Sequence, residues 1–219
     1  RLIYRGILSR PAVFKGLTRL GRLAEVTGLR RLVTRSRALN IWPVLQRAAE
    51  TGPVFPAQTG RSMIEAEKRR LGPPPSPRDR VVYFLGCAKD FLYGDAALAT
   101  YRVLWRNGVE VELPRVSCCG LPCHSAGDLE GARALARKNL AALSRCRAET
   151  IVVDESSCCS HLRNLGELFL GMPEEKRMRR LAERVVDLTV YLDRLGIVPP
   201  GPLTVTAGWH DPCHLRHHE

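Results

Sequence analysis

Two hydrophobic patterns alternate along the chain after residue 80. Short apolar runs, which are typical of buried strands, occupy residues 81–86, 109–113, 150–154 and 203–206. Apolar residues at steps of three and four predict helices over residues 95–107, 129–143 and 174–195. Strands that alternate with helices are typical of a parallel sheet. We therefore predict an α/β fold, in which a small parallel sheet is flanked by helices.

Two helix boundaries carry specific signals. Asp128 is a good N-cap for the helix that follows it, and Gly108 is a good stop for the helix before it. The inner face of the helix after Asp128 is predicted to hold Leu129, Ala132, Ala136, Leu140 and Leu143. The inner face of the last long helix is predicted to hold Leu181, Val185, Leu188, Leu192 and Leu195.

The first eighty residues have a different sequence pattern. Residues 1–50 are predicted to form short basic helices, interrupted at Gly28 and Pro43, with four residues on one apolar face: Leu17, Leu20, Leu23 and Ala24. Residues 51–80 are predicted to be a Pro-rich linker, because the run 72–77 fits neither a helix nor a central strand. We expect the native chain to continue beyond both ends, since it opens on Arg1 and stops just after a cysteine motif.

The charge of the chain is concentrated in the same segment. The formal net charge is +12, and residues 1–80 hold 17 Lys and Arg against 5 Asp and Glu, which accounts for all of it. Such a segment suits an acidic partner subunit or anionic lipid headgroups, or is simply a solvated basic face. Few aromatic residues lie among the basic ones, which argues against nucleic acid. No apolar run approaches the roughly 20 residues of a membrane-spanning helix.

Eight cysteines give the chain its candidate chemistry. Three predicted strands run towards cysteines: Cys87, the pair Cys118 and Cys119, and Cys158. Ligands gather at the carboxyl ends of strands in open parallel sheets, so these four thiols are expected to meet at one edge. Four thiolates are the usual ligands of an iron–sulfur cluster, and Gly120 would let the backbone pass close to it.

Two alternative roles for the cysteines stay open. Zinc also takes four thiolates, or a mixed set completed by His124, His161 or Glu155. Buried, chemically inert cysteines are common in protein cores, and Cys146 is interpreted in this way because it lies away from the others. Asp154 and Glu155 are not expected to act as an acid–base pair, and no catalytic residue is assigned.

At this point the sequence resembles a known family. The segments that match are Phe84-Leu85-Gly86-Cys87, Cys118-Cys119-Gly120-Leu121-Pro122, Ser125-Ala126-Gly127-Asp128, Cys158 with its preceding residues, and His210-Asp211-Pro212-Cys213-His214-Leu215. They resemble the cysteine-rich CCG domain of the glycolate oxidase iron–sulfur subunit, of lactate-utilisation iron–sulfur proteins, of the C subunit of anaerobic glycerol-3-phosphate dehydrogenase and of the B subunit of heterodisulfide reductase. The resemblance implies a first CCG domain over residues 81–200 and the start of a second over residues 201–219.

The resemblance also implies a function. It suggests a 4Fe–4S cluster, cubane or non-cubane, in an electron-transfer subunit that is not itself catalytic. The partner would be a flavoprotein that oxidises a 2-hydroxy acid or glycerol 3-phosphate, with electrons passing towards quinone or another carrier. We expect a cytoplasmic protein, peripheral on the inner face of the membrane through its basic arm. The alternatives are a heterodisulfide-reductase-like catalytic cluster and a non-redox docking module that is stabilised by structural zinc.

The chain departs from the family pattern in its last motif. Family members end this motif with Cys-x-x-Cys, but Glu155 stands at the first of these positions here. The five-thiolate cluster is therefore not carried over whole, and Cys159, Cys123 or Glu155 is the candidate replacement ligand. Cys213 is the candidate ligand of a second cluster, whose other cysteines would lie beyond Glu219.

Overall fold

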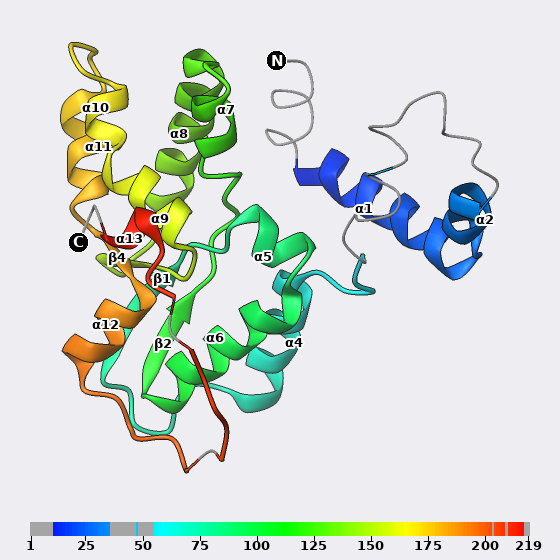
Figure 1. Ribbon diagram of the computed structural model, residues 1–219. Coiled ribbons are helices and arrows are strands. Elements are labelled where there is room, and N and C mark those ends of the chain that lie inside the picture. Colours follow the sequence, from blue (N-terminus) through cyan, green and yellow to red (C-terminus); the bar gives the residue numbers. More distant parts are fainter. Residues whose placement is uncertain (1–10, 36–46, 48–54, 203, 209, 217–219) are drawn as a thin grey trace.

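A four-stranded, all-parallel sheet forms the centre of the molecule. The computed structural model describes residues 11–35, 47, 55–202, 204–208 and 210–216 (Figure 1). The strand order is β2-β1-β3-β4, and the strands are β1 (Asp79–Tyr83), β2 (Val109–Glu112), β3 (Thr150–Val153) and β4 (Val185–Asp187). The predicted α/β fold with a small parallel sheet is confirmed.

The register of the sheet places buried residues of the two central strands, β1 and β3, side by side. Val82 of β1 lies opposite Glu112 of β2 on one side and Ile151 of β3 on the other. Side chains of β1 alternate between two cores, because successive residues of a strand point to opposite faces of the sheet. Val82 belongs to one core, whereas Val81 and Tyr83 belong to the other.

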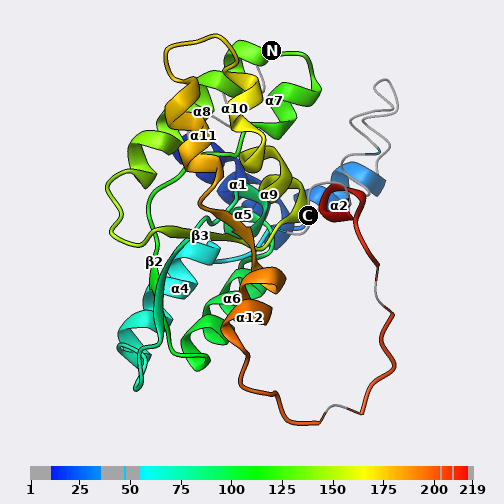
Figure 2. The same cartoon turned by 90° about the vertical axis from the view of Figure 1, so that its left-hand side faces the viewer.

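Helices cover both faces of the sheet (Figures 1 and 2). One core is closed by α8 (Leu129–Leu143), α9 (Ser156–Arg163), α10 (Leu165–Leu168) and α11 (Glu175–Ala182). The other is closed by α4 (Gly60–Leu71), α6 (Gly94–Arg106) and α12 (Leu188–Leu195). Short helices α5 (Cys87–Phe91), α7 (Leu121–Ser125) and α13 (Cys213–Arg216) complete the set.

The predicted helix boundaries near the centre of the chain are confirmed. The Asp128 carboxylate accepts a hydrogen bond from the Gly131 N–H at 3.2 Å and caps α8, and Gly108 follows α6 with a φ of +76°. The inner face of α8 differs in part from the prediction. Leu129 is exposed, and Leu135 and Asn139 are buried although neither was predicted.

The predicted long helix over residues 174–195 is wrong. The chain there forms α11, the short strand β4 and α12, and Val185 pairs with Ile151 at the free edge of β3. Asp187 then caps α12 by accepting the Thr189 N–H at 2.8 Å. Leu181 and Val185 fit the spacing of a helix, which explains the prediction. The open edge of β3 instead forms hydrogen bonds with Val185–Asp187, and these three residues become a strand.

The prediction of a fourth strand at 203–206 is also wrong for residues 204–206, the part that the structure describes. Residues 204–206 are exposed and lie outside the sheet, and residue 203 is not among the described residues. The described residues between α12 and α13 run outside the helical layers (Figure 2).

The N-terminal region contains three helices within the described residues. Helix α1 (Pro11–Val26) and helix α2 (Leu29–Arg35) are joined at Gly28, which has a φ of +72°, as the predicted interruption requires. The other predicted interruption, Pro43, lies outside the described residues. The segment 51–80, expected to be a Pro-rich linker, contains α4, whose Ile64 is fully buried against the sheet domain.

Candidate functional site

The carboxyl ends of β1, β2 and β3 deliver four cysteines to one edge of the sheet. Cys87 begins α5 just after β1, Cys118 and Cys119 follow β2, and Cys158 lies in the first turn of α9 after β3. The chain brings together residues that are up to 71 positions apart, because all strands are parallel and their carboxyl ends share an edge.

The four thiols form one continuous series. Neighbouring thiols in this series lie close enough to shift the pKa of one another, in the pairs Cys87 and Cys118, Cys118 and Cys119, and Cys119 and Cys158. The interaction with Cys118, together with burial, raises the pKa of the Cys87 thiol, and the interaction with Cys119 raises the pKa of Cys118 to about 12. Without a ligand these two thiols are protonated at neutral pH, so metal binding would release protons.

The donor set suits an iron–sulfur cluster in its chemistry. Within the described part of the chain, no three His, Cys, Asp or Glu side chains converge as a site for a single metal ion. A cluster spreads its thiolates over several iron atoms, so its four ligands need not share one point. The backbone at Gly86 lies close to one of the thiols, since a Cβ added there would lie 3.6 Å from the Cys158 Sγ.

Two side chains that are not cysteines fix the loop carrying Cys118. Asn139 of α8 is fully buried; its Oδ1 accepts the Ser117 N–H at 2.8 Å, and its Nδ2 donates to the Cys118 carbonyl at 3.0 Å. The Arg61 guanidinium of α4 donates to the carbonyls of Leu113 at 2.9 Å and Pro114 at 2.7 Å. Neither residue was predicted from the sequence, although an asparagine on the inner face of a predicted helix is a recognisable signal.

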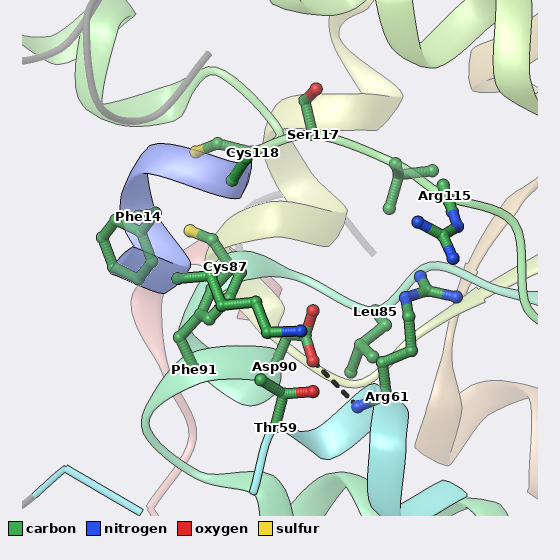
Figure 3. A pocket seen from close by; sticks show the side chains of 13 residues that line it. Phe14, Thr59, Arg61, Leu85, Cys87, Asp90, Phe91, Arg115, Ser117 and Cys118 are labelled. Carbon is green, nitrogen blue, oxygen red and sulfur yellow. Dashed lines mark hydrogen bonds between the residues drawn. The ribbon is translucent and has the colours of Figure 1, made fainter. Parts of the chain in front are cut away.

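Arg61 also connects this loop to the Cys87 segment. Its backbone N–H donates to the Asp90 carboxylate at 2.8 Å, and Asp90 lies in α5, three residues after Cys87 (Figure 3). Helix α4 therefore holds two cysteine-bearing segments in one arrangement.

A buried polar cluster lies beside the cysteines at the end of β3. The Asp154 carboxylate accepts hydrogen bonds from the Tyr83 hydroxyl at 2.7 Å and from the Thr100 hydroxyl at 2.8 Å. Lys89 of α5 lies 3.8 Å from Asp154 and 3.9 Å from Glu155. Burial and the neighbouring Asp154 raise the pKa of Tyr83. These contacts tie Asp154 at the end of β3 to side chains of β1, α5 and α6.

His161 presents a buried nitrogen to the backbone of the cysteine pair. Its Nε2 has no hydrogen-bond partner among the described residues, and burial, with nearby His124, lowers the pKa of His161 to about 4. A Cβ added at Gly120 would lie 3.3 Å from this nitrogen and 3.4 Å from the Ala132 carbonyl. Gly120 has a φ of +105°, so its lack of a side chain serves a left-handed turn and the close packing of α8 and α9.

The arrangement of strands and cysteines matches a known domain. Residues 81–163 match the family model described as the cysteine-rich domain CCG. This segment is a CCG domain. Helix α4 with Arg61 lies outside the matched residues, whereas all four linked thiols and Asn139 lie inside them.

Curated relatives of the chain include named iron–sulfur proteins. An uncharacterized iron–sulfur protein of Methanococcus maripaludis is 32% identical over 138 residues, which cover 63% of this chain and 26% of the relative. Lactate utilization protein A of Geobacillus kaustophilus is 31% identical over 140 residues, which cover 62% of this chain and 58% of the relative. The B subunit of the fumarate reductase (CoM/CoB) of Methanothermobacter marburgensis is 29% identical over 164 residues, which cover 73% of this chain and 31% of the relative.

This chain therefore spans only part of the length of these relatives. No solved structure matches the chain.

The remaining candidate ligands of the CCG domain lie in different surroundings. Cys123 and Cys159 are buried in the core, in α7 and α9, and the Glu155 side chain is 33% exposed. Cys213 is exposed on α13, which packs against α9. Cys146 is half-buried after α8, where its Sγ lies 3.7 Å from the Ala142 carbonyl, as expected of a structural cysteine.

Proposed function

We propose that the chain is an iron–sulfur electron-transfer subunit, with Cys87, Cys118, Cys119 and Cys158 as ligands of a 4Fe–4S cluster. The observation that carries the proposal is the convergence of four interacting thiols at the carboxyl edge of the parallel sheet. When bound, the cluster would supply one-electron transfer. The chain's own part is to hold the four thiolates at a fixed spacing and to limit the access of water to them.

The side chains around the thiols support this role. Cys118 and Cys119 are each 2% exposed, and burial is one of the factors that set the potential of such a cluster. Lys89 of α5 places a cation at the end of β3, beside Asp154 and Glu155. Asn139 and Arg61 keep the Cys118 loop in place without using a cysteine.

The names of the relatives support an oxidoreductase complex as the setting. We propose that a partner flavoprotein oxidises a 2-hydroxy acid or glycerol 3-phosphate and passes electrons through this chain towards quinone or another carrier. Chemistry on the substrate would belong to that partner. The names of the lactate utilization proteins and of the fumarate reductase subunit agree with a role beside a dehydrogenase or reductase.

We further propose that α1 and α2 form the docking arm. Leu17, Leu20 and Leu23 of α1 are 44%, 64% and 59% exposed, and basic residues lie on the same helix. In the described ranges, no helix has both the length and the apolar character needed to cross a membrane. Removal of residues 1–50 is expected to abolish co-sedimentation with the partner subunit or with anionic vesicles. Unchanged association of the truncated chain would contradict the docking role.

The experiment that tests the cluster is metal and sulfide analysis of protein purified without oxygen. We expect about four iron and four sulfide per chain, with a visible charge-transfer spectrum and an EPR signal after reduction. Cys118→Ser should remove most of the iron, whereas Cys146→Ser is the matched control and should retain it. About one zinc per chain without visible absorption would overturn the proposal.

A further inference from the structure

A cavity of about 420 Å³ lies directly against two of the four thiols. It is bounded by α1, by the start of α4, by α5 and by the loop before Cys118 (Figure 3). Cys87 and Cys118 lie on one side of this cavity, and the guanidinium groups of Arg61 and Arg115 lie on the other. The cavity therefore has a thiol wall and a separate arginine wall.

The charge of the lining is strongly positive. Three cations line the cavity, namely Lys15, Arg61 and Arg115, against one carboxylate, Asp90, which gives a formal charge of +2. The Asp90 carboxylate already accepts the Arg61 N–H at 2.8 Å. In the described part of the chain no carboxylate pairs with Arg115, which is exposed and faces Arg61. Two facing guanidinium groups repel each other, and an anion between them would relieve that repulsion.

The rest of the lining is largely apolar. Leu85, Phe91 and Val116 line the cavity together with Phe14, whose ring packs edge-on against Phe91 at a centroid distance of 4.7 Å. The volume lies within the range of roughly 300–1,000 Å³ that is typical of small-molecule sites. An apolar wall beside a cationic one suits an organic anion better than an inorganic one.

We propose that this cavity binds a small organic carboxylate, with its acid group between Arg61 and Arg115 and its carbon body against Leu85 and Phe91. Charge-assisted hydrogen bonds to guanidinium are short and strong, so the two arginines would fix the orientation of the acid group. The bound molecule would lie against Cys87 and Cys118. Because Cys87 and Cys118 are also proposed cluster ligands, the bound molecule would lie beside the cluster where one is present.

The test is isothermal titration of the full chain, purified without oxygen, with butyrate as the probe. Butyramide has the same shape without the charge, so it measures the contribution of the arginines. We expect saturable butyrate binding and at least about tenfold weaker binding of butyramide, since loss of one charge-assisted contact is worth a factor of about ten or more.

Arg115→Gln is the decisive variant, because this exposed side chain has no ion-pair partner among the described residues whose loss would unfold the domain. It is expected to weaken butyrate binding about tenfold. Arg106→Gln is the matched control, since Arg106 is also exposed but precedes β2, at the opposite edge of the sheet. Equal binding of butyrate and butyramide, unchanged binding by Arg115→Gln, or equally tight binding of inorganic phosphate would each overturn the proposal. Iron content decides the proposed function separately from this result.

Discussion

Replacement of Gly120 by alanine is expected to destabilise the domain by about 3 kcal/mol. The φ of Gly120 is +105°, beyond the region near +50 to +70° that other residues adopt, and such a strained backbone costs about 1–3 kcal/mol. The added Cβ would also lie 3.3 Å from the His161 Nε2 and 3.4 Å from the Ala132 carbonyl. Both neighbours belong to packed helices, so the contact adds to the strain.

Gly127→Ala is the matched control for this prediction. Gly127 has a φ of +72° and an added Cβ would meet no atom within 4 Å, so only the left-handed backbone is penalised, by about 1 kcal/mol. Urea denaturation followed by circular dichroism measures both losses, provided the two variants have the same dependence on urea concentration. A loss for Gly120→Ala equal to or smaller than that for Gly127→Ala would refute the close-packing argument.

Three further predictions concern groups around the site. Asn139→Ala should cost about 2–3 kcal/mol in unfolding free energy, because it leaves two buried backbone groups unpaired; an unchanged urea midpoint would contradict this. His161→Leu should stabilise the iron-free chain by about 1 kcal/mol, because it removes an unpaired buried nitrogen, and a lower urea midpoint would argue against it. Hydrogen bonds from Arg70 and Arg102 lower the pKa of Glu67 from 4.5 to about 2, so its stabilising effect is complete above pH 4.5 and is lost as the pH falls towards 2. The difference in melting temperature between the wild type and Glu67→Gln should therefore shrink over that interval, and a constant difference would contradict the assignment.

The sequence predicted the edge of the sheet well because strand and cysteine signals coincide there. The apolar runs at 81–86 and 150–154 are long enough to be recognised, and Cys87 and Cys158 follow them closely. The interaction of all four thiols with one another depends on the side-chain arrangement, which spacing alone does not provide. From the sequence, Gly120 was predicted to let the backbone pass close to a cluster. The structure shows that Gly120 also forms a left-handed turn and lies close to α8 and α9.

The missed elements have signals that are weak in the sequence. Strand β4 has only three residues, too few for a period of two to appear, and its formation depends on the open edge of β3. Helix α4 has a sparse apolar face, and its packing against α6 includes an ion pair between segments far apart in the chain. Arg102 of α6 contacts Glu67 of α4 at 2.7 Å, 35 positions away.

The groups that order the candidate cluster site are not the candidate ligands themselves. Asn139 holds the backbone on both sides of the Ser117–Cys118 bond, and Arg61 links the loop after β2 to Asp90 in α5. These bonds join protein groups only, so they restrict two of the cysteine-bearing segments without any contribution from the cysteine side chains. Because α4 lies outside the residues that match the CCG family model, the position of these segments depends on a helix that the cysteine motif alone does not define.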